Sequence, residues 1–333
     1  MEEGTPDPDK LHLLFGGDTM LGRRVNEAIR REGFTYPLEA VVRTTRAADL
    51  FLVNLECAIT PRDIQYSGPE KVFYFRADPV AAEVLTYAGV DLVSLANNHA
   101  LDADYDGLRD TLQILDEKEI LYVGAGVTRE AAARPAFLEA KGMRLGVLAY
   151  CDHQHDFAAG IDLPGIRYVD LSDLDTLTRL AREVEALARQ VDHVVVAFHW
   201  QLNWVPRVSS FYRSLARRLV EAGARIVWGH SPHHFQGVEW IDGSVVLYAT
   251  GGLVDDYRLV PEFRNDRQLL FQLRVSQQRV EQVRAYPLEL KRSRTRAAAA
   301  DARQWIAERF GQMCGDLGSR VEQQGQWLDV LPE

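Results

Sequence analysis

Short apolar runs, rich in Val, Leu, Ile and Phe, recur along the chain, and each run stops abruptly at polar residues. Runs of this length are typical of strands that are buried on both faces. The early runs occupy residues 11–15, 50–53, 91–95, 145–150, 194–198 and 225–228. Two later runs, at 245–249 and 269–275, lie close enough in the sequence to pair as a hairpin. The pattern therefore predicts a fold built on buried strands.

Segments of helical character separate the early runs. They cover residues 79–88, 104–116 and 172–190, and Ser172 is the expected N-cap of the third. A strand followed by a helix, repeated along the chain, predicts an α/β fold. Because the sequence shows no internal repeat and no low-complexity linker, we expect one main domain over residues 10–290.

The composition changes near Lys291, where a basic stretch leads into an amphipathic segment. Trp305, Ile306 and Phe310 share one face of the helix that this segment predicts. We expect residues 291–333 to form a C-terminal helical extension that packs on the same domain. A separate functional role for this helix is the less common alternative.

The charge balance narrows the range of partners. The chain carries 38 Lys and Arg against 48 Asp and Glu, a formal net charge of −10. Such a field repels nucleic acid and anionic membranes. A small anionic substrate stays compatible with it, because bound divalent cations invert the local potential at a carboxylate-lined site. The sequence does not indicate an oligomeric state.

Cysteine usage and the N-terminus bear on the compartment. Cys57, Cys151 and Cys314 are widely separated, which argues against a disulfide framework or a zinc ribbon. The acidic start, MEEGTPDPDK, lacks the basic and apolar regions of a secretory signal, and no apolar run is long enough to span a bilayer. We expect a cytoplasmic protein, unless a leader has been removed.

Residues that bind metals follow several of the predicted strands. They are Asp18, Glu56, Asn98, His199, His230 and His233. In α/β folds ligands collect beyond the carboxyl ends of strands, so these side chains are expected to meet. Asp18 is expected behind a Gly16-Gly17 turn, where the backbone can approach a ligand closely. The set predicts a centre for divalent ions, two in number, and its nitrogen and oxygen donors suit Mn, Fe and Zn alike.

Taken singly, each of these residues has a plainer explanation as a turn residue, a surface carboxylate or a hydrogen-bonded histidine. The segment GHSPHH at 229–234 is more specific, because imidazoles packed so closely need partners. We expect His230 and His233 to point inward and His234 to face outward. The sequence leaves open which of His233 and His234 is the ligand.

The Asn97-Asn98-His99 run suggests a division of labour. If Asn98 holds a metal, His99 stands beside the cations as a general acid toward a leaving oxygen, or stabilises charge on a phosphoryl group. Asp102 or Asp104 is placed to orient its imidazole. The alternative is that His99 is another ligand or a structural residue.

Four further residues are candidates to bind an anionic substrate around this centre. They are Arg23, Arg76, His153 and His155. The two histidines follow the predicted strand at 145–150, so their segment is expected over the site, and arginine suits phosphate or carboxylate. For any one of them, a solvated side chain or a local ion pair is the alternative.

Several motifs together resemble the CapA family of poly-gamma-glutamate capsule synthesis proteins, within the calcineurin-like metallophosphoesterase superfamily. They are GGDTMLGR at 16–23, NLECAIT at 54–60, YFRADP at 74–79, SLANNHALD at 94–102, GAGVTREAAARP at 124–135 and GHSPHHFQGVE at 229–239. The resemblance spans residues 11–257. It implies a sandwich of two mixed sheets flanked by helices, with a metal centre at one edge. It also implies the six ligand positions above and His99 as the catalytic histidine.

The chain departs from the family pattern at three places. Met20 stands where the superfamily usually has a second histidine ligand, as is usual for CapA-like chains, so one cation is expected to be held more weakly. Gln201 follows His199-Trp200 where relatives tend to have glycine, and Gly251-Gly252-Leu253 replaces Gly-Asn-Phe. A retained metal core with an altered rim implies a substrate unlike that of typical members.

We therefore expect a metal-dependent hydrolase that cleaves a phosphate ester of a small anionic substrate with a metal-bridged hydroxide. The same chemistry would serve amide or gamma-glutamyl bonds linked to poly-gamma-glutamate, which is a second hypothesis. A third is a non-catalytic, metal-binding accessory protein for an anionic polymer, since a fold does not fix a function.

Overall fold

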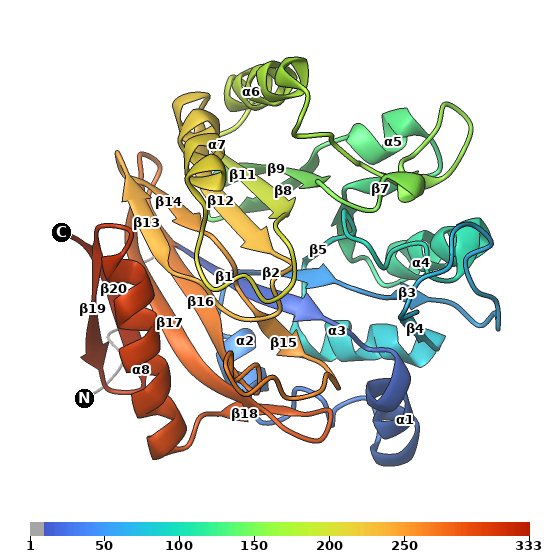
Figure 1. Cartoon of the computed structure of the whole chain (residues 1–333), viewed down its shortest axis with the longest axis horizontal. Coiled ribbons are helices and arrows are strands. Elements are labelled where there is room, and N and C mark those ends of the chain that lie inside the picture. The colour runs from blue at the N-terminus through green and yellow to red at the C-terminus, as the bar shows by residue number, and fades with distance from the viewer. Residues whose placement is uncertain (1–9) are drawn as a thin grey trace.

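Two large β-sheets form the protein, and the computed structural model describes residues 10–333 of it. The acidic N-terminal segment considered above therefore lies, apart from Lys10, outside the described residues. The ten-stranded sheet has the order β19-β20-β17-β16-β1-β2-β5-β6, with β15 beside β1 and β18 beside β17. The six-stranded sheet has the order β13-β14-β12-β11-β9-β8 (Figure 1). Two short pairs, β3 with β4 and β7 with β10, complete the strands of the described chain.

The strands of the ten-stranded sheet are β1 (Leu11–Thr19), β2 (Leu50–Leu55), β5 (Leu92–Ser94), β6 (Leu121–Val123), β15 (Gly252–Val254), β16 (Arg267–Val275), β17 (Val280–Leu290), β18 (Thr295–Ala297), β19 (Ser319–Gln324) and β20 (Trp327–Pro332). Those of the six-stranded sheet are β8 (Ala136–Ala140), β9 (Met143–Cys151), β11 (His193–His199), β12 (Ala224–His230), β13 (Val238–Ile241) and β14 (Ser244–Leu247). The short pairs are β3 (Ala58–Ile59), β4 (Arg76–Ala77), β7 (Ala125–Gly126) and β10 (Gly165–Ile166).

Helices flank both sheets. They are α1 (Arg23–Glu32), α2 (Val42–Thr45), α3 (Ala82–Ala88), α4 (Asp104–Glu117), α5 (Arg129–Ala133), α6 (Leu174–Ala188), α7 (Ser210–Glu221) and α8 (Ala300–Gly315), with the short helices η1 (Pro79–Ala81) and η2 (His155–Phe157). Both sheets mix parallel and antiparallel pairs, since β1 is parallel to β2 and antiparallel to β16, and β14 is parallel to β12 and antiparallel to β13. The predicted α/β sandwich of two mixed sheets is confirmed.

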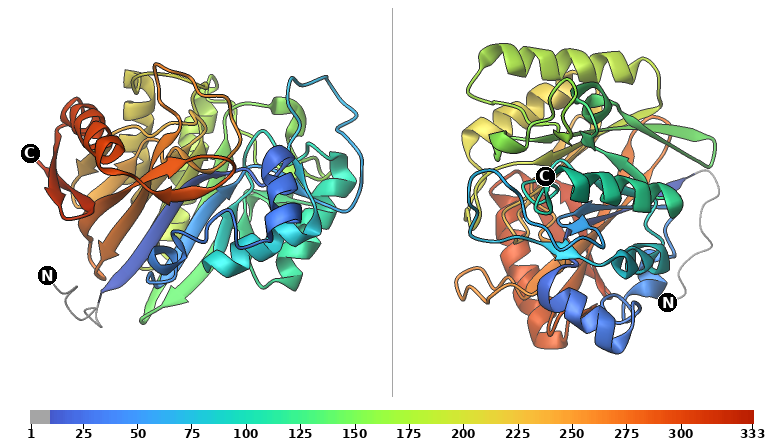
Figure 2. Two further views of the ribbon diagram at one scale, coloured as in Figure 1. Left: turned by 90° about the horizontal axis from the view of Figure 1, so that it is seen from below. Right: turned by 90° about the vertical axis from the view of Figure 1, so that its right-hand side faces the viewer.

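The continuous apolar runs arise because strands of the six-stranded sheet are buried on both faces. Along β11, Val195 and Ala197 face the ten-stranded sheet, whereas Val194, Val196 and Phe198 pack under α6 and α7. Figure 2 shows these two helices on the outer side of the six-stranded sheet. Side chains on both faces of such a strand must be apolar, so no alternation appears in the sequence.

The expected Gly16-Gly17 turn is wrong, because β1 continues through both glycines to Thr19. The glycines serve a close approach instead. A Cβ on Gly17 would lie 1.8 Å from the carbonyl oxygen of Gly251, and the N–H of Asp18 donates to that oxygen at 2.8 Å. Asp18 is therefore fixed within the sheet rather than carried by a flexible turn.

Two other local predictions are corrected. The runs at 245–249 and 269–275 do not form a hairpin, since β14 pairs with β12 and β13 while β16 belongs to the other sheet. Ser172 is not the N-cap of α6. Asp173 takes that place, and its carboxylate accepts a hydrogen bond from the N–H of Asp175. Ser172 instead bonds to the carboxylate of Asp170.

The C-terminal segment joins the ten-stranded sheet (Figure 1). Strand β20 pairs with β17, and α8 packs against β17 and β16. Ile306 and Phe310 of α8 are fully buried, and Trp305 is partly buried. Among residues 10–333, no helix is both long and apolar enough to cross a bilayer.

Candidate metal centre

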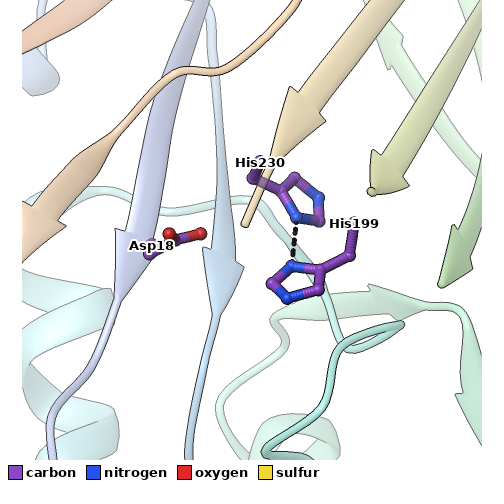
Figure 3. A group of neighbouring side chains, drawn as sticks. All are labelled: Asp18, His199 and His230. Atoms are coloured by element: carbon purple, nitrogen blue, oxygen red, sulfur yellow. Dashed lines mark hydrogen bonds between the residues drawn. The ribbon is translucent and has the colours of Figure 1, made fainter. Parts of the chain in front are cut away.

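The predicted ligands meet where the ends of β1, β2 and β5 face the ends of β11 and β12. Asp18 lies near the end of β1, and Glu56 directly follows β2. His199 and His230 are the last residues of β11 and β12 and lie side by side in their register. Figure 3 shows the Asp18 carboxylate directed towards the two imidazoles. The two sheets therefore contribute opposite walls of one site.

Asp18, His199 and His230 form a first group of donors, with one atom from each within 4.8 Å of the others. The Nδ1 atoms of His199 and His230 are 2.7 Å apart, so one ring carries the proton between them. Burial lowers the pKa of His230 to about 4 and the pKa of His199 well below its ordinary value. Both imidazoles are therefore neutral at neutral pH, which is the form that binds metals.

Asp18, Glu56 and His233 form a second group, so Asp18 belongs to both. Nδ1 of His233 lies 2.9 Å from Oδ2 of Asp18, whose other oxygen accepts a 2.9 Å hydrogen bond from Asn54. Glu56 is fully buried, and within residues 10–333 neither of its carboxylate oxygens has a hydrogen-bond donor. Burial, followed by the charge of Asp18, raises the pKa of Glu56 well above its ordinary value.

Asn98, which follows β5, adjoins both groups. Its Oδ1 lies 3.0 Å from Nε2 of His199, and the same nitrogen is 3.9 Å from Oε1 of Glu56. The side-chain amide of Asn97 donates a 2.9 Å hydrogen bond to the carbonyl oxygen of Leu55. The turn after β5 is thereby tied to the end of β2, which holds Asn98 near Glu56.

These donors fit divalent cations. Both oxygens of Glu56 and Nε2 of His230 are buried without hydrogen-bond partners in the described chain. Buried polar atoms are seldom left unsatisfied, so each such atom requires an explanation. A cation held among these carboxylate, amide and imidazole atoms satisfies them together, and the donor set suits first-row transition metals.

The turn after β12 holds its backbone in an unusual conformation. Ser231 and His233 have φ values of 112° and 60°, which are rare for residues other than glycine. Strain of this kind costs roughly 1–3 kcal/mol per residue and clusters at functional sites. It brings His233 to the donor groups. His234 does not face outward as expected but is buried, with its ring nitrogens 2.9 Å from the carbonyl oxygens of Phe235 and Val205.

His99 lies beside the donor groups. Its Nε2 is 4.0 Å from Oε1 of Glu56, and its ring stacks on Phe75 with centroids 3.9 Å apart. Burial lowers the pKa of His99 to about 4. The free imidazole is therefore neutral at neutral pH and presents Nε2 near the carboxylates.

Asp102, rather than Asp104, orients the His99 ring. Nδ1–H of His99 donates to Oδ2 of Asp102 at 2.5 Å. The same oxygen accepts a 2.6 Å bond from the N–H of Phe75, and Lys71 Nζ donates to the other oxygen at 2.5 Å. Asp104 instead accepts hydrogen bonds from two nearby backbone N–H groups.

A cavity of about 420 Å³ opens beside His99 and His233. Its other lining residues include Phe73, Phe75, Trp204, Tyr257, Arg23 and Arg258. The Arg23 guanidinium lies 5.4 Å from the ring centroid of Phe73 and 5.5 Å from that of Phe75. A mostly apolar cavity of this volume with a few charged groups is typical of a small-molecule site.

The four residues expected to bind substrate do not all reach this region. Arg23 lines the cavity, and the ring of His153 lies 4.9 Å from that of His199. Arg76 lines a different cavity, where it pairs with two carboxylates. His155 is exposed at the start of η2.

Sequence reasoning missed Lys71, Asp255 and Tyr257. Oδ2 of Asp255 and the hydroxyl of Tyr257 are buried without a partner in the described chain. Burial raises the pKa of Asp255 to about 7. The available signal was two acidic residues and a tyrosine at the end of a short apolar run, but the sequence does not show which way those side chains turn.

The positions that depart from the family pattern have structural roles of their own. The sulfur of buried Met20 accepts a 3.1 Å hydrogen bond from a backbone N–H, and Gln201 donates a 3.0 Å bond to Gln236. A Cβ on Gly252 would lie 2.9 Å from Oδ2 of Asp255. An asparagine at Gly252 would therefore displace that carboxylate.

Comparison with known proteins identifies relatives of the whole chain. The chain is 29% identical to a probable polyglutamine synthesis accessory protein of Mycobacterium tuberculosis, over 98% of this chain and 97% of the relative. It is 28% identical to the capsule biosynthesis protein CapA of Bacillus anthracis, over 74% of this chain and 60% of that protein. The PGA biosynthesis protein CapA of Bacillus subtilis is also 28% identical, over 76% and 65%.

Solved structures share the fold at low sequence identity. A hypothetical protein from Thermus thermophilus is similar with a TM-score of 0.51 and 17% identity, covering 84% of this chain and 99% of that one. The sulfate thiohydrolase SoxB of Thermus thermophilus has a TM-score of 0.50 and 10% identity, covering 92% and 61%. The fold is that of the calcineurin-like metallophosphoesterases.

A family model decides the assignment. Residues 12–257, most of the chain, match the family described as bacterial capsule synthesis protein PGA_cap. The matched segment contains every predicted ligand, His99 and the turn that carries His233. The protein therefore belongs to the PGA_cap family of CapA-type proteins, within the metallophosphoesterase-like superfamily.

Proposed function

We propose that the protein is a metal-dependent hydrolase that cleaves a phosphate ester of a small anionic substrate. The observation that carries the proposal is the buried carboxylate of Glu56, which has no hydrogen-bond donor and lies beside Asp18, His233 and the neutral imidazoles of His99 and His199. Burying such a charge is costly unless a cation pairs with it. The neighbouring cavity and His99 supply a place for substrate and a proton-transfer group.

Two cations, chosen among Mn, Fe and Zn, would be held by overlapping sets of residues. Asp18, Glu56 and His233 would hold one, and Asp18, His199 and His230 the other, with Glu56 and Asn98 close to His199. When bound, such cations supply Lewis acidity, which activates water and neutralises charge on a phosphoryl group. Glu56 would serve both cations, because its two oxygens are free of other partners in the described chain.

His99 would transfer a proton to the leaving oxygen. Asp102 accepts the Nδ1–H of His99, so Nε2 is left to exchange protons on the side of Glu56 and the cavity. Burial keeps the free imidazole neutral, and an anionic substrate beside it favours the protonated form. Nε2–H would then protonate the departing alkoxide.

The cavity supports a small substrate. Its volume of about 420 Å³ suits one small molecule, and Arg23 and Arg258 offer positive charge at its wall. His153, close to His199, would contact the anionic group from the other sheet. Because the chain as a whole is negatively charged, an anionic substrate would be attracted only locally, by cations bound at the site.

The names of relatives favour two alternative functions. Two relatives are PGA biosynthesis or capsule biosynthesis proteins, which favours amide or gamma-glutamyl chemistry at the same centre. A third is named a probable polyglutamine synthesis accessory protein, which favours metal-dependent binding of an anionic polymer without turnover.

The test is a substrate screen with the purified chain loaded with Mn, Fe or Zn. Phosphomonoesters, phosphodiesters and gamma-glutamyl peptides are compared for the wild type and His99→Ala, with His12→Ala, at the far end of β1, as control. We expect turnover of a phosphate ester that His99→Ala lowers at unchanged metal content. Turnover of gamma-glutamyl peptides alone would support the second function, and no turnover with any metal would support the accessory role.

A further inference from the structure

Tyr257 places a buried hydroxyl beside the metal centre. Its ring lies 4.8 Å from the ring of His233 and 5.6 Å from that of Phe75, and the side chain lines the cavity that also contains His99. The backbone N–H of Tyr257 donates to Oδ1 of Asp255 at 3.0 Å, which fixes the segment after β15. The ring is therefore packed against His233 and Phe75, and the backbone that carries it is held by Asp255.

The hydroxyl has no hydrogen-bond partner anywhere in residues 10–333. Burial, together with the negative charges of its neighbours, raises the pKa of the Tyr257 hydroxyl. These neighbours are Glu56, Asp255, Asp18 and Asp256. None of them accepts a hydrogen bond from the hydroxyl in the described residues. Phenols are protonated at neutral pH, which makes this buried group a hydrogen-bond donor that lacks an acceptor.

Packing alone does not explain the hydroxyl. Phenylalanine would make the same ring contacts with His233 and Phe75 without burying an unpaired polar group. A buried hydroxyl without a partner costs roughly 1–3 kcal/mol. The remaining explanation is an acceptor that arrives with a ligand.

We propose that the Tyr257 hydroxyl donates a hydrogen bond to an anionic oxygen of the substrate, which makes Tyr257 a substrate-contacting, catalytic residue. The inference rests on the proposed function and names a further donor at that site. The ligand class is a tetrahedral oxyanion, which would contact Tyr257 on one side and the cations held by Asp18 and Glu56 on the other. His99 and Tyr257 both pack on the ring of Phe75, and the two polar groups would contact different oxygens of one phosphoryl group.

The test removes the hydroxyl group of Tyr257. Tyr257→Phe and wild type, both loaded with the metal that the wild type binds best, are titrated calorimetrically with orthophosphate and orthovanadate. A hydrogen bond to a charged oxygen predicts roughly ten- to hundredfold weaker binding of both anions by the variant. Tyr286→Phe, which removes a hydroxyl bonded to Gln326 far from the centre, is the matched control and should bind as the wild type does.

Two further measurements separate this role from others. Metal content of Tyr257→Phe should equal that of the wild type, and its metal-free form should melt no lower, because an unpaired buried hydroxyl has been removed. Loss of metal in the variant would make the hydroxyl a cation ligand and overturn the proposal, as would unchanged anion binding. If the metal-loaded wild type binds neither anion, the proposed function fails and this inference fails with it. If the wild type binds the anions and Tyr257→Phe binds them equally well, this inference fails and the proposed function stands.

Discussion

At the scale of single residues, the site contains buried polar groups of two kinds: groups that would find a partner only when a ligand binds, and a group that is already fully hydrogen-bonded. Glu56 has no donor for either oxygen, and Tyr257 has no acceptor for its hydroxyl in the described chain. Asp102, in contrast, is fully satisfied by His99, Phe75 and Lys71. The unsatisfied groups would contact ligands, and the satisfied group holds a side chain in position.

Glu56→Gln should separate stability from metal binding. A folded-state pKa raised above the unfolded value means that the ionised carboxylate destabilises the folded state at neutral pH and that stability increases as pH falls. Removing the charge should therefore stabilise the metal-free protein, by about 1–3 kcal/mol, and sharply reduce metal affinity. Urea denaturation with and without metal measures both effects.

Glu27→Gln, an exposed residue of α1, is the control for Glu56→Gln and should change neither quantity. A metal-free Glu56→Gln protein that is less stable than the wild type would show that the carboxylate is paired in the folded state.

Asp102→Asn should lower turnover of the substrate found in the screen by about ten- to a hundredfold, the usual effect of removing an orienting partner. Asparagine no longer favours the Nδ1–H tautomer of His99 or pairs with Lys71. Metal content should stay the same, since Asp102 belongs to neither donor group. Asp104→Asn, the alternative considered from the sequence, should leave kcat unchanged, and equal losses in both variants would contradict the assignment.

At the scale of elements, glycines set the distance between β1 and the segment before β15. A Cβ on Gly17 would lie 1.8 Å from the Gly251 carbonyl oxygen, and β1 could not keep its place beside that segment. The proposed ligand Asp18 directly follows Gly17 in the same strand. Precise placement of Asp18 therefore depends on the absence of a side chain one residue earlier.

Gly17→Ala should destabilise the protein by roughly 1–3 kcal/mol through overpacking and reduce its metal content. Gly311→Ala in α8 is the matched control, because a Cβ there meets nothing within 4 Å. Alanine in that helix should stabilise by about 0.5–1 kcal/mol. The free energy of unfolding in urea distinguishes the two, and a neutral Gly17→Ala would contradict the close approach.

Much of the element layout was predictable from the sequence because buried strands need unbroken apolar runs, and those at 145–150 and 194–198 became β9 and β11. Strand ends extended further than the runs, since Asp18 and His199 are ordered by sheet hydrogen bonds despite being polar. The hairpin expected for 245–249 and 269–275 failed because sequence proximity does not decide which sheet a strand joins.

The proposed ligand set could be predicted from the sequence because each member follows an apolar run or lies in a distinctive histidine motif. The orientation of Tyr257, Asp255 and Lys71 was not accessible, since it depends on contacts between segments distant in the chain. Arg76 was a candidate because arginine suits anions, and His155 because it follows a predicted strand. In the structure Arg76 lines another cavity, and the His155 side chain is exposed.

At the scale of the whole molecule, buried neutral histidines link folding to pH. His193, at the start of β11, is buried, and its Nε2 lies 2.7 Å from the carbonyl oxygen of Ser276. Burial lowers its pKa, so the unfolded chain binds a proton that the folded protein resists. Its contribution favours folding above the unfolded pKa and is lost as pH falls below about 6.5.

His193→Gln should therefore reduce the loss in the free energy of unfolding as the pH falls. In metal-free protein, the free energy of unfolding of the wild type should fall below about pH 6.5, and the variant should lose up to about 1.4 kcal/mol less per pH unit. Urea denaturation at several pH values between 5 and 8 measures the slopes, and parallel curves would contradict the role of His193.

The division of the ligands between two sheets has a mechanical consequence. Asp18 and Glu56 come from the ten-stranded sheet, whereas His199 and His230 end strands of the six-stranded sheet. A bound cation would thus add a further link between two layers that apolar contacts and hydrogen bonds, such as that between His193 and Ser276, already join. Metal binding would therefore stabilise the folded arrangement of the two sheets. A change that moves one sheet relative to the other would, in turn, weaken metal binding.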